Sequence, residues 1–384
     1  MSLAAVSARA GFVLPPAIAT RDSGLAGNVV AMPTDGPSIL FHNAAGVADI
    51  DGTAMTMSVG GGYSAGRYEH ALLPYDEESL ATPIAPSLWV GTDRLKPWYV
   101  GAGLYGTVGT SFKFDADPSA GIPNRFLDEM SIAQLGLVAG RELAPGLRVG
   151  VEIAPSVGKM RVRTPTLLGP LAFKIEGPGI SGAAGLLYDV GPRTTVGVSY
   201  RSPGIVFMSG GGRLGETRER VRLNLHVPDS VTVGVAHRAT ERLTLTAQAR
   251  WTDYPDFEQG QMEFRRNAML NQPFIRDARA TFRYGIGLEY QILPSAQVRA
   301  GISREEWMIQ PRAMTPLLYD TNDLSFGLGG GFTSGPWTVD LALGVSHIDD
   351  RVVSVREQVL LAGRYRLGVG GAGVAVTYRF AGPP

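Results

Sequence analysis

Apolar and polar positions alternate with a period of two in segment after segment, from about residue 52 to the end of the chain. In the stretch that begins at Trp337, positions such as Val339 and Leu341 are large and apolar, whereas the intervening positions are small or polar and include Asp340. Successive side chains of a β-strand point to opposite faces, so each segment has one apolar and one polar face. This pattern predicts a transmembrane β-barrel whose apolar side chains face lipid and whose polar side chains face the lumen.

The alternation predicts fourteen strands that are joined in turn by short and by long connections. The short links are rich in Gly, Pro and Ser, which favour tight turns. Short periplasmic turns, long extracellular loops and an even strand number are typical of outer-membrane barrels. The predicted fold is therefore an all-β, 14-stranded antiparallel transmembrane barrel with both termini on the periplasmic side. Strands are predicted at residues 53–63, 82–90, 97–109, 131–143, 147–157, 173–190, 194–202, 221–238, 243–254, 278–292, 297–307, 323–333, 337–348 and 366–380, and long loops at 64–81, 110–130, 156–172, 203–220, 255–277, 308–322 and 349–365.

Composition narrows the alternatives. The chain has 384 residues, a net charge of zero, 50 glycines and no cysteine. The zero net charge gives no reason to expect a nucleic-acid partner, and the absence of cysteine excludes disulfides and thiolate metal sites. No apolar run reaches the roughly 18 residues that a spanning helix needs, which excludes a helical membrane protein.

The first fifty residues differ from the rest, because Gly and Pro interrupt them and no strand alternation persists. A barrel of this size encloses a lumen that its own side chains cannot fill, since they suffice only up to roughly eight strands. We therefore expect residues 1–51 to form a hatch that plugs a barrel at residues 52–380, with a short tail at 381–384. The small-x-small sequence at residues 8–10 has the form of a signal cleavage site, so the start of the chain is either a trimmed leader or an ordinary terminus.

Several short segments point to a known family. The segment Asp35-Gly36-Pro37-Ser38-Ile39-Leu40-Phe41-His42-Asn43-Ala44-Ala45-Gly46 stands in the expected hatch, and four others follow or precede it in order: residues 10–12, 200–203, 227–234 and 251–254. Together they resemble the FadL family of outer-membrane transporters for long-chain fatty acids and hydrocarbons. The family's plug motif commonly reads Asn-Pro-Ala-Gly, and this chain has Ala44 in place of the proline.

The resemblance implies a bacterial outer-membrane, fourteen-stranded barrel that carries out passive transport without a cofactor. In this scheme extracellular loops capture a hydrophobic small molecule, the hatch moves, and the substrate leaves sideways through an opening at a kink in the third strand. Lateral exit is physically reasonable, because exposing an apolar chain to periplasmic water costs roughly 0.8 kcal/mol per CH₂. The implied hatch residues are Phe41, His42, Asn43, Ala44, Ala45 and Gly46.

Two further sets of residues complete the predicted substrate path. Glycines of the third strand either leave a gap or bulge in the wall or merely allow close packing: Gly101, Gly103, Gly106 and Gly109. Leucines that are unusually apolar for extracellular loops are expected to form the capture groove: Leu72, Leu73, Leu317 and Leu318. We expect a monomer whose surroundings are outer-membrane lipid and lipopolysaccharide.

Basic residues cluster in a predicted extracellular loop, at Arg213, Arg218, Arg220 and Arg222, and again at residues 265–266. They could pair with lipopolysaccharide phosphates or with a fatty carboxylate. A solvated loop in which Glu216 and Glu219 balance the charge is the interpretation that we favour from sequence.

Catalytic residues and metal ligands are not predicted. The chain lacks a Gly-x-Ser-x-Gly elbow and a His-Glu-x-x-His motif. A barrel lipid hydrolase would require His237, whose outward phase near a strand end favours interfacial packing instead. A structural or adhesive barrel whose loops bind a partner is the other alternative to transport, and the sequence does not identify a substrate.

Overall fold

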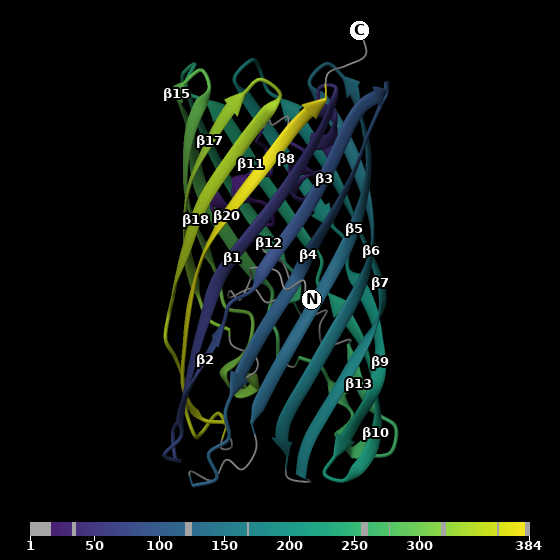
Figure 1. The fold of residues 1–384 in the computed structure, drawn as a ribbon, viewed down its shortest axis with the longest axis vertical. Helices are drawn as coiled ribbons and strands as arrows, with labels where there is room; N and C mark the ends of the chain where they lie inside the picture. Colours follow the sequence, from purple (N-terminus) through teal and green to yellow (C-terminus); the bar gives the residue numbers. More distant parts are fainter. Residues whose placement is uncertain are drawn as a thin grey trace.

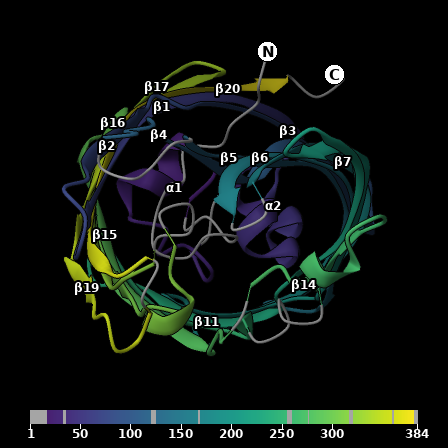
Figure 2. The ribbon, with the colours of Figure 1, turned by 90° about the horizontal axis from the view of Figure 1, so that it is seen from below.

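The wall of the molecule is a closed antiparallel β-barrel of 14 strands, as predicted. The computed structural model describes residues 17–32, 36–119, 125–166, 169–254, 260–275, 277–315, 320–358 and 361–380. Figure 1 shows the tilted strands from the side, and Figure 2 shows the ring that they form along the barrel axis. Strand β1 (Thr53–His70) pairs with β20 (Gly363–Phe380) along its whole length, which closes the wall within one chain.

Strands that are neighbours in sequence are also neighbours in the wall. Two wall strands are interrupted: β9 continues β8, and β11 continues β10. Pro203 lies in the first interruption and Pro228 in the second, and proline lacks the N–H that the ladder needs. Between β1 and β20 the wall contains β3 (Ile84–Leu95), β4 (Trp98–Phe114), β5 (Phe126–Ala144), β6 (Leu147–Thr166), β7 (Gly169–Asp189), β8 (Thr194–Arg201), β9 (Gly204–Leu214), β10 (Thr217–Val227), β11 (Ser230–Arg238), β12 (Leu243–Thr252), β15 (Thr281–Leu293), β16 (Ala296–Glu305), β17 (Asp323–Ser334) and β18 (Trp337–Ile348).

Smaller elements lie at the end of the barrel that carries the long connections. They are the short strands β2 (Asp76–Ala81), β13 (Gln261–Phe264), β14 (Gln272–Pro273) and β19 (Arg351–Val353), and the 3-10 turns η3 (Ala268–Leu270) and η4 (Pro311–Ala313). In Figure 1 this end lies opposite the arrowhead of β20. None of the helices among the described residues is long and apolar enough to cross a membrane.

Side chains alternate between the two faces of the wall as the sequence predicts. On β6, Val151 and Ile153 are 58% and 60% exposed on the outer face, whereas Glu152 between them is 3% exposed. The charged side chains of Arg250, Arg299 and Glu305 are likewise buried on the inner face. The lumen is thus the polar side of the wall in this part of the barrel, and lipid contacts its apolar side.

Two of the predicted long loops are wrong. Residues 156–172 belong mostly to β6 and β7, which pair as far as Thr166 and Gly169, and residues 203–220 form the hairpin of β9 and β10. The strands continue past the lipid layer, and there the outward side chains become charged while the inward ones become apolar. A search for outward apolar residues therefore ends each strand too early.

The N-terminal segment, which here means residues 17–32 and 36–50, lies inside the ring (Figure 2). Its helical elements are short because Gly and Pro divide the segment: α1 (Thr20–Gly24), α2 (Ile39–His42) and the 3-10 helix η1 (Ala44–Asp49). Asn43 is the N-cap of η1, and its side-chain oxygen accepts a hydrogen bond from the Ala45 N–H. The segment buries its apolar side chains against Trp89, Tyr105 and Val138 of the wall.

Candidate functional site

The extracellular half of the lumen is an apolar chamber. Inward side chains of β4 to β7, β9, β10 and β13 pack against those of the extracellular loops. Methionine and aromatic residues are prominent among them. Thioether and aromatic side chains adapt to irregular apolar ligands, because methionine is flexible and polarizable. The chamber residues include Phe112, Phe114, Phe126, Met130, Met160, Phe173, Met208, Met262, Phe264, Ile275, Met308, Ile309 and Met314.

The chamber has a cavity of about 410 Å³ at its extracellular mouth, a volume suited to a small hydrophobic ligand. Met160, Phe173 and Phe274 line it, together with the polar side chains of Asp128 and Arg312. Of the leucines predicted for a capture groove, Leu73 packs against the chamber and Leu72 is exposed. Leu317 and Leu318 lie outside the described residues.

One extracellular loop is fastened over the chamber by a buried carboxylate. Asp320 accepts hydrogen bonds from the backbone N–H groups of Met308 and Ile309, whose side chains belong to the chamber. Burial raises the pKa of Asp320 to about 7, against the opposing effect of the two N–H donors and of Arg351 at 3.9 Å. The loop anchor therefore titrates near neutral pH.

The N-terminal segment forms the floor of the chamber. Phe41 contacts the ring of Tyr105 edge-on at 5.3 Å, and Tyr105 stacks on Trp89 at 4.7 Å. The Tyr105 hydroxyl donates to the Glu152 carboxylate at 2.7 Å. The ring nitrogen Nε2 of His42, which follows Phe41 in the motif, lies 3.1 Å from the Asp22 carboxylate of α1. The predicted hatch motif therefore contacts both the wall and its own segment.

Two wall arginines hold the backbone of this floor. Arg201 donates to the carbonyl oxygen of Phe41 at 2.8 Å and pairs with Glu152 at 3.1 Å. Arg283 donates to the carbonyl oxygen of Ala26 at 2.8 Å, and Glu305 lies 3.2 Å from it. Since each guanidinium is paired with a wall carboxylate, the charge is compensated within the lumen.

Two asparagines and several wall glycines complete the contact. Asn43 donates to the carbonyl oxygens of Val30, Leu186 and Val198, and Asn28 does the same to Leu25, Ile286 and Ile302. A Cβ on wall residue Gly150 would lie 2.3 Å from the Ala44 carbonyl oxygen. The wall can approach the floor backbone closely there only because glycine has no side chain.

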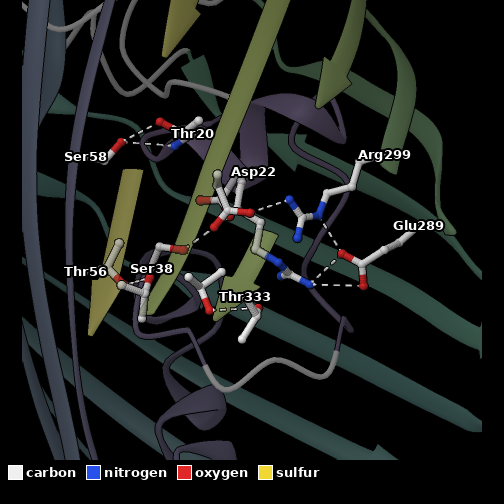
Figure 3. A network of polar contacts seen from close by, with 12 residues as sticks. Thr20, Asp22, Ser38, Thr56, Ser58, Glu289, Arg299 and Thr333 are labelled. Carbon is white, nitrogen blue, oxygen red and sulfur yellow. Dashed lines mark hydrogen bonds and ion pairs between the residues drawn. The ribbon is translucent and has the colours of Figure 1, made fainter. Parts of the chain in front are cut away.

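The periplasmic half of the lumen is polar. A cavity of about 750 Å³ lies between the N-terminal segment and β15 to β18 and β20. Arg21 pairs with Glu289 at 3.1 Å, Glu289 with Arg299, and Arg299 with Asp340 at 2.6 Å. Figure 3 shows Arg299 and Glu289 in this network, with Thr20 hydrogen-bonded to Ser58 nearby.

The backbone ladder is interrupted beside the third strand, β4, where the Lys113 N–H donates to the Ser79 hydroxyl of β2 instead. The ladder of β4 with β3 runs from Trp98 to Leu104 and is not continued by residues 105–114, although β4 still pairs with β5 there. The β4–β5 register shifts between Gly106 and Val108, which marks a bulge. A cavity of about 70 Å³ adjoins this interruption and is lined in part by Gly106, Ala85 and Pro86.

The four predicted glycines of β4 occupy different surroundings. A Cβ on Gly101 would lie 2.5 Å from Leu40 of the floor, and one on Gly103 would lie 2.1 Å from the Trp89 ring. Both thus permit close packing, whereas Gly106 lies at the bulge and Gly109 on the stretch that β3 leaves unpaired.

Sequence reasoning missed Trp89 and Tyr105, whose only signal was an aromatic residue in an inward phase.

The match to a family model supports the assignment that these features suggest. Residues 171–380 match the model described as outer membrane protein transport protein (OMPP1/FadL/TodX). No curated protein sequence matches the chain.

Solved structures share the fold at low sequence identity. A FadL homologue of Pseudomonas aeruginosa is 16% identical, with a TM-score of 0.83 and coverage of 97% of this chain and 100% of that one. The toluene transporter TodX of P. putida is 14% identical, with a TM-score of 0.75 and coverage of 96% and 100%. The toluene transporter TbuX of Ralstonia pickettii is 17% identical, with a TM-score of 0.72 and coverage of 96% and 99%.

The family model covers more than half of the chain, and the barrel architecture agrees with the solved structures. The chain therefore belongs to the outer membrane protein transport family (OMPP1/FadL/TodX) and is a β-barrel protein of the bacterial outer membrane.

Proposed function

We propose that this protein is a passive outer-membrane transporter for hydrophobic small molecules, such as long-chain fatty acids or hydrocarbons. The observation that carries the proposal is the apolar chamber, which is open toward the extracellular mouth and closed below by the N-terminal segment. An apolar ligand gains free energy on leaving water for such a chamber, at roughly 25 cal/mol per Å² of buried surface. Chamber, floor and wall come from one chain, which supports a monomeric transporter.

The N-terminal segment acts as a hatch in this proposal. Phe41 and Asn43 of the motif contact the wall at Tyr105 and at the Leu186 carbonyl oxygen. Wall arginines Arg201 and Arg283 hold the segment at two backbone carbonyls. The polar cavity of about 750 Å³ on its periplasmic side provides space into which it could shift. Substrate would then leave between β3 and β4, where the ladder ends and where lipid rather than water receives it.

A reversible tether tests the hatch. The Thr20 and Ser58 hydroxyl oxygens lie 2.8 Å apart, and the chain has no cysteine of its own. In the double variant Thr20→Cys/Ser58→Cys, oxidation should join the segment to β1 and abolish uptake of radiolabelled oleate and of toluene by cells. Reduction should restore uptake, and the two single-cysteine variants serve as controls. Full uptake with the disulfide formed would sink the hatch proposal.

A bulky side chain at the interrupted ladder tests the exit. Ala85→Trp should fill the small cavity beside Gly106 and slow uptake severalfold, because the proposed exit is blocked while the chamber is unchanged. Ala184→Trp, on the outer face of β7, is the matched control that should leave uptake unaltered. Equal uptake by both variants and the parent protein would rule out this exit. The chamber and the hatch would then still be tested by the disulfide experiment.

A further inference from the structure

A basic face covers the outer side of β6, β7, β9 and β10 immediately beyond the lipid-facing apolar residues. On β6 the outward positions change from Val157 to Lys159 within two residues. At a rise of roughly 3.3 Å per residue, the basic part of β6 extends about 20 Å along the strand beyond Val157. The basic face consists of Lys159, Arg161, Arg163, Lys174, Arg213, Arg218, Arg220 and Arg222, all of them exposed.

The strand registers place like charges directly opposite each other on this face. Arg161 of β6 is the partner of Lys174 of β7, and Arg213 of β9 is the partner of Arg218 of β10. Like charges at directly opposed positions of an antiparallel pair destabilise the sheet. An anion bound between them from outside would remove that repulsion.

The carboxylates of the chain balance only part of this face: Glu129 stands opposite Arg161, Glu176 opposite Lys159 and Glu263 opposite Arg222. Glu219, which the sequence suggests as a counter-charge, is 5% exposed and points away from the basic face; its carboxylate accepts hydrogen bonds from the backbone N–H of Arg266 and from the Asn267 side chain. Among the described residues, the Arg161–Glu129 contact at 3.6 Å is the ion pair that this face makes. Outward carboxylates are fewer than the basic residues: Glu129, Glu176, Glu216 and Glu263.

The opposite side of the barrel provides a comparison within the same molecule. There Arg67 pairs with Asp76 and Glu78, while Arg364 and Arg366 each lie 3.1 Å from Asp350. Figure 1 shows β2 and β20 on one side of the extracellular end and β9 and β10 on the other. The unbalanced charge is therefore a property of one face, in a chain whose net charge is zero.

We propose that the basic face binds the phosphate groups of lipopolysaccharide in the outer leaflet. The protein is an outer-membrane barrel, and the face begins where its apolar lipid contact ends, at the level of the lipid head groups. Guanidinium groups bind phosphate oxygens in bidentate fashion, and a cluster of them matches a ligand with more than one phosphate. This surface is separate from the transport path, because its side chains point away from the lumen.

The test compares two triple variants of the full chain in detergent. Lys174→Gln/Arg218→Gln/Arg220→Gln removes charge from the basic face, and Arg67→Gln/Arg364→Gln/Arg366→Gln removes the same charge from the opposite side. Binding of purified rough lipopolysaccharide, measured by native mass spectrometry and by titration, should weaken at least tenfold in the first variant and stay unchanged in the second. Resistance of the barrel to unfolding in SDS before heating verifies that both variants are folded.

The wild-type protein supplies an arm that needs no substitution. Dephosphorylated lipopolysaccharide should bind it about as weakly as intact lipopolysaccharide binds the first variant. Equal binding by both variants, or undiminished binding of the dephosphorylated lipid, would overturn the proposal. Inorganic phosphate should not displace lipopolysaccharide when the two are present at equal concentrations of phosphate groups. Such displacement would also overturn the proposal, because it would identify a site for free anions.

Discussion

The two halves of the lumen differ in chemistry although the same strands line both. On β6, Glu152 points inward in the periplasmic half and Met160 points inward in the extracellular half, with 3% exposure each. The outward neighbours change in the opposite sense, from Val151 to Arg161. The pleat keeps even-numbered residues of β6 inside throughout, and only the medium around the barrel changes.

The phase of the side chains and the polarity of each face therefore have different causes. Phase is fixed by the strand, because side chains alternate wherever the ladder continues. Polarity is fixed by what each face contacts: lipid outside in one half, water and lipid head groups outside in the other. The inversion turns the extracellular half of a membrane barrel into an apolar container, and the charged periplasmic half holds the N-terminal segment beneath it.

The largest expected effect comes from the charged half. Glu305 pairs with Arg250 at 3.0 Å and with Arg283 at 3.2 Å, and all three side chains are buried. Glu305→Gln removes the carboxylate that these two buried guanidinium groups share, so the free energy of unfolding should fall by about 3–5 kcal/mol. Urea unfolding of the protein in lipid vesicles measures this change.

The control for that prediction is Glu241→Gln, which removes an exposed partner of Arg193 at a periplasmic turn. An exposed pair contributes little, so its loss should be barely measurable. Equal losses at Glu305 and Glu241 would show that the lumenal ion pairs do not stabilise the periplasmic half as inferred.

The next effect concerns the apolar half and uses two adjacent residues. Met160→Glu places an unpaired carboxylate in the chamber, and the affinity for a hydrophobic probe such as a long-chain alcohol should fall by about 2 kcal/mol, roughly 30-fold. Arg161→Glu changes the charge more but lies on the outer face, so affinity should not change. Isothermal titration in detergent distinguishes the two, and similar losses in both variants would contradict the assigned inversion.

A smaller effect tests where the two halves meet. Gly150→Ala puts a methyl group against the Ala44 backbone and should displace the N-terminal segment at a cost of about 1–3 kcal/mol. Its displacement should make the N-terminal segment easier for a protease to cleave. It should also raise the ion conductance of the barrel in planar bilayers. Gly368→Ala is the matched control, because nothing lies within 4 Å of its added Cβ. Unchanged conductance in both variants would mean that this close contact does not position the segment.

The smallest effect is a pH dependence of the loop over the chamber. Because burial raises the pKa of Asp320 from 3.8 to about 7, its contribution to stability is greatest below pH 4 and is lost as the pH rises through 7. Between pH 5 and 8, amide exchange of residues 306–315, corrected for intrinsic rates, should accelerate severalfold. Asp320→Asn keeps a hydrogen-bond acceptor and should abolish the pH dependence; a variant that responds to pH like the parent would disprove the assignment.

Much of the candidate site was accessible from sequence, but not its boundaries. The motif around Asn43 could be singled out because it resembles the plug motif of the FadL family and stands in a segment without strand alternation. The chamber could not be predicted, because residues 156–172 and 203–220 carry charged and apolar residues in the reverse of the expected sense. The partners of Arg201 and Arg283 are also beyond sequence, since the backbone carbonyls that they bind lie 160 and 257 residues away.

The alternation, the strand number and the tight periplasmic turns follow from the sequence, because a period of two and the turn residues are local properties. Where polarity inverts, which carbonyls the lumenal arginines hold and where the ladder beside β4 ends follow from the folded barrel. These features depend on barrel closure, which brings distant segments together and fixes how far each strand extends beyond the lipid.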